Sequence, residues 1–181
     1  MENKLVTVVI PCYNHENYIQ QAINSVLSQD YPTIELIVID DGSTDNSPRI
    51  IKELHDKHQN FTYLSQKNSG LIATLKLELN RAKGEFFCQL ASDDFLASNS
   101  ISKRAEILCT NPDCVAVFTD AYSVDGNTVT QQRVTRDKLK QMYTSDDPIT
   151  LILKGAPPIF ATGLLRTSAL QAIDAFDSTT F

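Results

Sequence analysis

Short apolar runs alternate with stretches of helical spacing along the first half of the chain. Four runs, at residues 5–10, 35–39, 61–64 and 86–90, are bounded by turn residues, as is typical of buried parallel strands. Residues 16–29 carry apolar side chains at three- and four-residue spacing, which predicts a helix. Further helices are predicted from a cap at Ser43 or Thr44 to residue 58, over 70–82 and over 98–109. The order predicts an α/β fold with a mostly parallel central sheet flanked by helices.

The second half of the chain has a less regular pattern. Its predicted elements are a strand at 115–119, a hairpin over 122–130, helices over 136–143 and 149–154, a strand at 160–165 and a helix at 168–173. A chain of 181 residues with 42% hydrophobic content can bury one sizeable core. We therefore expect a single domain over residues 1–181.

Composition narrows the class of function. A formal net charge of −6 without a concentrated basic face argues against binding to nucleic acid. No apolar stretch approaches the roughly 18 residues that span a bilayer, and the first residues lack a signal-peptide pattern. The four cysteines are irregularly spaced, mostly in or beside apolar runs, which fits buried thiols in a reducing compartment. We therefore expect a cytoplasmic protein.

Two acidic pairs follow two of the predicted strands. Asp40 and Asp41 end the second apolar run, and Asp93 and Asp94 come shortly after the fourth. Ligands of open α/β sheets collect at the carboxyl ends of the strands. One or two carboxylates together with substrate phosphates are the usual ligands of Mg²⁺, and Mn²⁺ also prefers oxygen ligands. We expect Asp93 and Asp94 to hold a ribose hydroxyl and a divalent cation, Mn²⁺ or Mg²⁺.

The end of the first predicted strand offers groups suited to a nucleobase. Pro11 ends the strand, and Tyr13 and Asn14 follow it at the same sheet edge as Asp41. The tyrosine ring can stack on a flat base, and a carboxylate can accept a hydrogen bond from an N–H of uracil or guanine. A structural alternative stays open, because aspartate is also favoured at helix caps and in turns.

Two other enzyme classes fit the sequence poorly. A nicotinamide-dependent dehydrogenase would carry Gly-x-Gly-x-x-Gly after its first strand, where this chain has Pro-Cys-Tyr-Asn-His at 11–15. A phosphoryl-transfer enzyme could use Asp40 as nucleophile. The residues after Asp40 do not match the usual phosphatase loop, however, and no supporting lysine motif is evident.

Several motifs occur in a fixed order along nearly the whole chain. They are VIPCYN at 9–14, AINSVLSQ at 22–29, ELIVIDDGSTD at 35–45, the glycine at 70, AKGE at 82–85, ASDD at 91–94, GLLR at 163–166 and FD at 176–177. Together they resemble family 2 of the glycosyltransferases, which have the Rossmann-like GT-A fold. The resemblance implies a nucleotide-binding half over residues 1–97 and the start of an acceptor-side half over 98–181.

The resemblance also implies an activity and a set of site residues. Members transfer a sugar from a nucleotide-diphosphate donor, here with a UDP-sugar favoured, with inversion of the anomeric centre. The expected acceptor is a saccharide or a lipid-linked saccharide in the synthesis of a bacterial surface polysaccharide. The donor nucleotide-binding residues implied by motif position are Pro11, Tyr13, Asn14, Asp41, Gly70 and Asp93. The implied metal ligands are Asp94 and Asp93.

Three departures from the family pattern qualify these expectations. Ala91 stands where the family's motif often has its first aspartate, and Leu75 and Lys76 stand where many members carry Arg-Asn. The family's general base, a carboxylate, comes shortly after the segment that resembles 175–177, whereas this chain ends at Phe181.

We therefore expect a truncated portion of a longer enzyme, whose general base lies beyond Phe181 and which can associate peripherally with the inner face of the membrane. The alternative is a nucleotide-sugar-binding module without turnover, which the missing base and Ala91 would permit.

Overall fold

A six-stranded sheet forms the centre of the molecule. The computed structural model describes residues 3–125, 128–133 and 162–177. Strand order is β3-β2-β1-β4-β8-β5, with β1, β2, β3 and β4 parallel, and β8 antiparallel to both β4 and β5. The strands of this sheet are β1 Val6–Cys12, β2 Ile34–Asp40, β3 Thr62–Ser65, β4 Phe86–Gln89, β5 Ala116–Phe118 and β8 Gly163–Arg166. The predicted α/β class with a mostly parallel sheet is confirmed.

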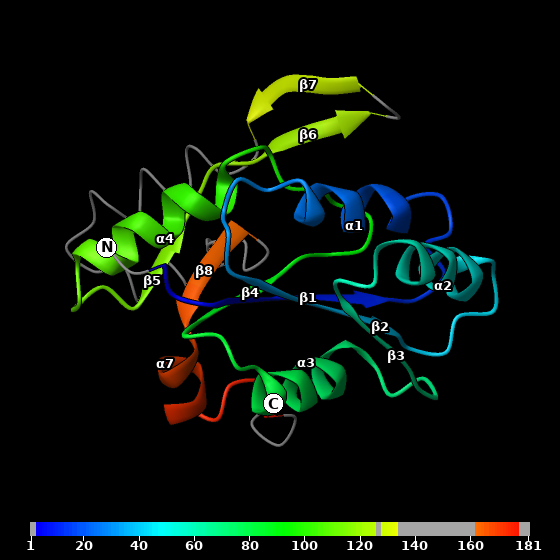
Figure 1. Cartoon of the computed structure of the whole chain (residues 1–181), viewed down its shortest axis with the longest axis horizontal. Helices are drawn as coiled ribbons and strands as arrows, with labels where there is room; N and C mark the ends of the chain where they lie inside the picture. The colour runs from blue at the N-terminus through cyan, green and yellow to red at the C-terminus, as the bar shows by residue number, and fades with distance from the viewer. Residues whose placement is uncertain (1–2, 126–127, 134–161, 178–181) are drawn as a thin grey trace.

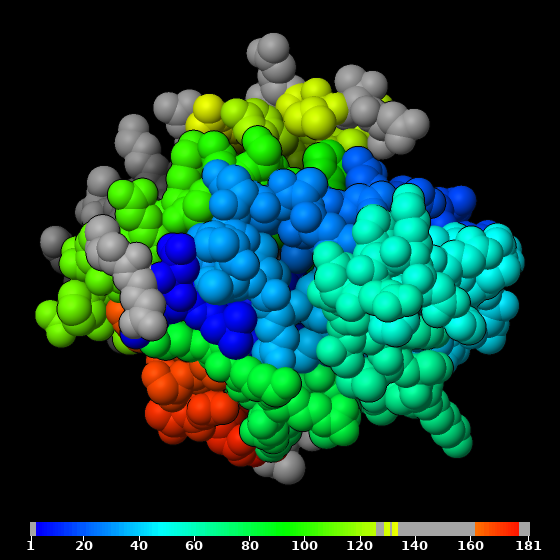
Figure 2. All heavy atoms as spheres, in the orientation of Figure 1, coloured from blue at the N-terminus to red at the C-terminus, as the bar shows by residue number. Residues whose placement is uncertain are grey.

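Helices cover both faces of the sheet. Helices α1, α2 and α4 bury their apolar sides in one core, whereas α3 and α7 pack on the opposite face (Figure 1). Their bounds are α1 Ile19–Leu27, α2 Ser47–His58, α3 Leu71–Arg81, α4 Ser100–Thr110 and α7 Thr167–Ala172. The predicted hairpin is present as β6 Tyr122–Asp125 and β7 Thr128–Arg133. In the space-filling view it lies at the opposite side of the molecule from α7 (Figure 2).

Alternation along the central strands explains their continuous apolar runs. In β1, Val6, Val8 and Ile10 face the core under α1, α2 and α4, whereas Val9 faces the core under α3. Each of these side chains has an exposed fraction of 0%. A strand covered on both faces needs apolar residues at every position, which is why the first half of the sequence predicts its strands well.

Two predicted boundaries were wrong. Strand β1 continues through Pro11 to Cys12, with Pro11 opposite Ile39 of β2. Strand β4 pairs with β1 only as far as Val9, so on that side Pro11 needs no N–H for the ladder. Neither Ser43 nor Thr44 caps α2, which begins at Ser47 after an N-cap at Asn46.

The least regular part of the sequence is only partly covered by the structure. The predicted helices over 136–143 and 149–154, and the first residues of the strand predicted at 160–165, lie outside the described residues. The described end of that strand is β8, and the helix predicted at 168–173 is α7. Among the described residues, no helix combines the length and apolar character needed to cross a bilayer.

A buried arginine joins α4 to β8, and the sequence pattern did not predict it. Arg104 has an exposed fraction of only 1%. Its guanidinium donates to the carbonyl oxygens of Thr162 and Gly163 at 3.1 and 3.0 Å and to the backbone oxygen of Ser100 at 2.9 Å. A buried charge needs such partners, so this contact fixes the start of β8 against α4.

Candidate functional site

Loops after β1 and β2 are joined through Asn14 at the carboxyl edge of the sheet. Its backbone N–H donates to Ser43 Oγ at 3.0 Å, and its side-chain oxygen accepts the backbone N–H of Thr44 at 2.8 Å. Asn14 has a φ of 56°, a left-handed conformation that asparagine tolerates better than most residues. The hydroxyls expected to cap α2 are instead used to hold these two loops together.

A second set of contacts joins the same loops just beyond Asn14. The backbone N–H of Glu16 donates to Asp45 Oδ2 at 2.9 Å, and the backbone N–H of Asn46 donates to Glu16 Oε2 at 2.7 Å. The backbone N–H of His15 donates to Ser47 Oγ at 3.0 Å. These reciprocal bonds make the two loops one rigid surface.

Asp40 and Asp41 are both buried and both brace loops. Asp40 accepts the backbone N–H of Ser43 at 3.2 Å. Asp41 accepts the Gln66 amide and the Ser69 backbone N–H on Oδ1, at 2.8 and 2.9 Å, and the Gly70 backbone N–H on Oδ2 at 2.9 Å. Burial opposes ionisation of Asp41, but these hydrogen bonds outweigh it and hold its pKa below the usual value.

Two glycines at positive φ shape these loops, and one of them also allows a close approach. Gly42 has a φ of 77°, and a Cβ atom there would lie 2.7 Å from the backbone nitrogen of Asn68. Gly70 has a φ of 83°, with open space where a Cβ would be. Gly70 is the N-cap of α3, one residue before the start of the helix that was predicted over 70–82. Its proposed contact with a diphosphate remains a prediction.

Tyr13 offers an exposed ring beside these loops. Its exposed fraction is 48%, and it follows Cys12, the last residue of β1. Pro11 is half-buried within the strand. Cys12 is buried, and this burial raises the pKa of its thiol, which keeps the sulfur protonated rather than nucleophilic.

The acidic pair after β4 lies in a different environment. Asp93 and Asp94 are exposed, and within the described part of the chain neither carboxylate has a hydrogen-bond or ion-pair partner. Partial enclosure of the carboxyl group and the charge of Asp93 raise the pKa of Asp94. His15 Nδ1 lies 2.7 Å from Ser92 Oγ, and this hydrogen bond connects the loop of the pair with the loop after β1.

The pair suits a divalent cation but does not enclose one. No group of three or more His, Cys, Asp or Glu side chains placed to hold a metal occurs among the described residues. Two adjacent carboxylates without competing partners can still supply part of an octahedral shell, if phosphate oxygens and water complete it. The donor set therefore fits Mg²⁺ or Mn²⁺ held jointly by protein and substrate, and the metal remains a prediction.

Lys76, which stands within the pair of residues where many family members carry Arg-Asn, forms ion pairs with two acids. Its ammonium lies 3.3 Å from Asp174 and 3.5 Å from Asp177. Both acids follow α7, which packs against α3 on the face of the sheet opposite α1. The pairing ties α3 to the end of the described chain.

Sequence reasoning located both acidic pairs but missed the residues that position them. Gln66 and Ser69 hold Asp41 across 25 and 28 residues of sequence, and Ser92 reaches His15 across 77. The available signal was a polar segment, Ser65 to Gly70, directly after an apolar run. Such a segment predicts a loop but does not indicate which side chain it contacts.

Comparisons with known proteins agree with this arrangement. A family model described as glycosyl transferase family 2 matches residues 7–173. A glycosyltransferase of Haemophilus influenzae is 38% identical over 112 residues, which cover 61% of this chain and 45% of that protein. Chondroitin synthase of Escherichia coli is 31% identical over 121 residues, which cover 67% of this chain and 18% of that enzyme.

One solved structure shares both fold and moderate identity. It is the crystal structure of S. aureus TarS residues 1–349 in complex with UDP, with a TM-score of 0.72 and 26% identity. The match covers 94% of this chain and 49% of TarS 1–349. The chain thus spans about half the length of this protein and of the Haemophilus relative. The similarity confirms the predicted GT-A fold.

Proposed function

Because the chain belongs to glycosyl transferase family 2, we propose that it takes part in transfer of a sugar, with inversion, from a nucleotide-diphosphate donor to a saccharide or lipid-linked acceptor. A UDP-sugar is the favoured donor. The observation that carries the proposal is the meeting of three loops at one sheet edge, where the Asn14 and His15 contacts join the loops after β1, β2 and β4. The UDP complex of TarS supports the choice of uridine.

The loops after β1 and β2 supply the nucleoside side of the proposed site. The exposed ring of Tyr13 can stack on the base. Asp41 Oδ1 accepts the Gln66 amide, the Ser69 backbone N–H and, at 3.3 Å, the Ser69 hydroxyl, whereas Oδ2 accepts only the Gly70 N–H. A carboxylate oxygen has about two acceptor positions, so Oδ2 retains one that suits an N–H of uracil, and the loop contacts fix the carboxylate in the orientation that this bond would require.

The loop after β4 supplies the diphosphate side. Asp93 and Asp94 are exposed neighbours, and partial enclosure of the Asp94 carboxyl together with the repelling charge of Asp93 raises the pKa of Asp94. A divalent cation would relieve this repulsion and, when bound, would stabilise the negative charge on a departing diphosphate. Gly70, which carries no side chain at the start of α3, allows the backbone to approach the phosphates.

Transfer also requires a base to take the proton of the acceptor hydroxyl. We assign none among the described residues, because Asp177, the carboxylate nearest to the expected motif, pairs with Lys76. The similarity to chondroitin synthase supports a polysaccharide as acceptor or product, and a lipid-linked acceptor would place the whole protein at the inner face of the membrane.

Calorimetric titration with UDP tests the donor site. We expect binding in Mn²⁺ or Mg²⁺ that is lost in EDTA and in the variants Asp93→Asn and Asp94→Asn. Asp30→Asn is the matched control, because Asp30 is also exposed but lies before β2. Unchanged UDP binding in both site variants, or no binding by the wild type with either metal, would contradict the proposal.

Release of UDP from a panel of UDP-sugars, with and without saccharide acceptors, separates transfer from binding. Acceptor-dependent release supports a transferase. Binding of a UDP-sugar without release of UDP would favour the alternative, a nucleotide-sugar-binding module without turnover. The observation that supports this alternative is Ala91 in place of an aspartate.

A further inference from the structure

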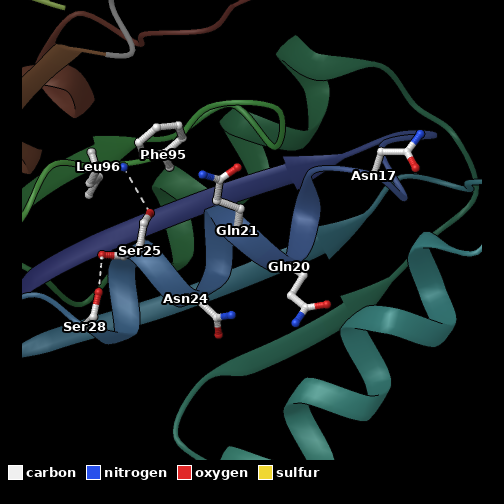
Figure 3. A pocket seen from close by; sticks show the side chains of 8 residues that line it. All are labelled: Asn17, Gln20, Gln21, Asn24, Ser25, Ser28, Phe95 and Leu96. Atoms are coloured by element: carbon white, nitrogen blue, oxygen red, sulfur yellow. Dashed lines mark hydrogen bonds between the residues drawn. The ribbon is translucent and has the colours of Figure 1, made fainter. Parts of the chain in front are cut away.

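A groove runs along the outer side of α1. Its volume is about 600 Å³, and six of its eight lining residues lie between Asn17 and Ser28. The other two are Phe95 and Leu96, which directly follow Asp94. Figure 3 places Gln21 and Ser25 on the side of α1 that faces Phe95 and Leu96, with Gln20 and Asn24 further round the helix. The groove therefore begins beside the proposed diphosphate site.

The groove differs from an ordinary solvated helix face in carrying no charge. Residues 17–29 contain no Asp, Glu, Lys, Arg or His. On α2, which covers the same face of the sheet, Arg49 pairs with Glu53 and Lys52 pairs with Asp56. A chain with 21% charged residues thus has one exposed helix face built from amides and hydroxyls alone.

The amides of the groove are free to bind a ligand. In the described part of the chain, no hydrogen bond engages the side chains of Asn17, Gln20, Gln21 and Asn24. Gln29, one turn further on, is fully used: its amide donates to Ala97 O at 2.9 Å and its oxygen accepts the N–H of Ile101 at 3.1 Å. The amide that braces the structure therefore lies just beyond the end of α1, and the amides without such a role lie before it.

The Phe95 wall of the groove is held in place. The backbone N–H of Leu96 donates to Ser25 Oγ at 3.0 Å, and the Gln29 contacts fix the residues that follow. The half-buried ring of Phe95 therefore offers a positioned apolar surface next to free amides. Preorganised walls lower the ordering cost of binding.

From these features we infer that the α1 groove binds a neutral oligosaccharide. Sugar hydroxyls both donate and accept hydrogen bonds, and an amide offers two donors and one acceptor to match them. An aromatic ring can pack on the C–H face of a pyranose, while the lack of charged residues disfavours acidic ligands. The residues that line the groove lie between Asn17 and Leu96, so they are outside the half over 98–181 that the family resemblance implies for the acceptor side.

The inference rests on the proposed function for its role: the groove would hold an acceptor or product chain beside the donor site. The test is side-chain amide NMR of the chain titrated with cellohexaose and chitohexaose to about 10 mM, with hexagalacturonic acid as the charged comparison. We expect shifts of the Asn17, Gln20, Gln21 and Asn24 amide signals with a Kd of about 1 mM, caused by at least one neutral hexasaccharide and not by the acidic one.

Variants make the test specific to the groove. Gln21→Ala with Asn24→Ala should weaken binding at least about tenfold by removing two hydrogen-bonding groups, and alanine favours the helix. Asn80→Ala is the control, because Asn80 is exposed on α3. No shift with either neutral hexasaccharide, or shifts unchanged in the double variant, would overturn the inference. A dimeric free chain that becomes monomeric in the double variant, without any sugar-induced shift, would also overturn the inference, because the groove would then be a contact between two copies of the chain.

UDP titration of the same samples separates this inference from the proposed function. UDP binding without sugar-induced shifts of the groove amides would contradict oligosaccharide binding in the groove and support the donor site. Sugar-induced shifts of the groove amides without UDP binding would support oligosaccharide binding in the groove and contradict the donor site.

Discussion

Two aspartate pairs lie at or after the ends of two parallel strands, β2 and β4, yet their surroundings differ. Asp41 is buried, accepts three short hydrogen bonds and has a lowered pKa. Asp94 is exposed, its carboxylate has no hydrogen-bond or ion-pair partner among the described residues, and its pKa is raised. The first pair is part of the folded framework, whereas the second retains its binding capacity for a ligand. The same sequence signal therefore marks one position that builds the site and one that is left open in it.

Removal of the Asp41 carboxylate is the strongest test of this difference. Asp41→Ala leaves the Gln66 amide and the N–H groups of Ser69 and Gly70 without their acceptor, so we expect a loss of about 4 kcal/mol in the free energy of unfolding. Urea denaturation measures it. Asp94→Ala is the matched variant and should change the same quantity by less than about 0.5 kcal/mol. Equal losses of free energy of unfolding in the two variants would show that the two carboxylates do not differ in their contribution to the fold.

Substitutions of the two glycines near Asp41 should differ in how much free energy of unfolding they cost. Gly42→Ala is expected to cost about 3 kcal/mol, because backbone strain at positive φ adds to a contact with Asn68. Gly70→Ala has the strain without the contact and should cost about 2 kcal/mol. Thermal and urea unfolding compare the two. A larger loss at Gly70 would show that the packing of Gly42 against Asn68 does not matter.

Acid should lower the free energy of unfolding by protonating Asp41. Because its folded pKa lies below the unfolded value of about 3.9, the stabilisation is complete above that value and is lost as the pH falls through the folded pKa. We expect the stability gap between wild type and Asp41→Asn to narrow from pH 5 to pH 2.5, by about 1 kcal/mol or more. Urea midpoints across this range test it, and a constant gap would contradict it.

The contact between His15 and Ser92 should couple the two regions weakly. A double-mutant cycle of His15→Ala and Ser92→Ala should give a coupling of about 1 kcal/mol in unfolding. The same cycle with His58→Ala in place of His15→Ala is the control, because His58 is exposed on α2. Coupling equal to the control would mean that the two loops are positioned independently.

The smallest effect is expected at the open pair itself. Without metal, Asp94→Asn should leave stability unchanged or raise it by up to about 0.5 kcal/mol near pH 7, because it removes the repulsion from Asp93. With UDP and Mn²⁺, the wild type should gain a thermal shift that the variant does not show. A shift of the same size in both proteins would place the metal elsewhere.

Local pattern predicted most of the fold, because burial on both sides leaves a clear apolar run in β1, β2 and β4. It failed where distant partners decide the structure. Ser43 and Thr44 have the chemistry of helix caps, but Asn14, about 30 residues away, engages them instead. Arg104 looks like a solvated helix residue in sequence and is buried only because Thr162 and Gly163 lie against it.

In the candidate site, too, local sequence predicts some features and distant contacts decide the others. Asp41 and Asp94 stand out in the sequence because each belongs to an acidic pair that follows an apolar run. Their opposite environments depend on Gln66, Ser69 and Gly70, which come from another loop. Sequence spacing therefore predicts where the carboxylates lie, but their protonation depends on contacts that only the folded chain forms.

The strand order has a consequence for how the chain folds. In the described structure β5 pairs only with β8, although β8 follows it by more than 40 residues. During synthesis the parallel strands β1 to β4 can assemble from contiguous sequence, whereas β5 must wait for β8. Pairing at such separation slows folding, because the loop between the strands must close first. We expect a fast folding phase for the sheet of β1 to β4 and a slower phase when β8 inserts between β4 and β5.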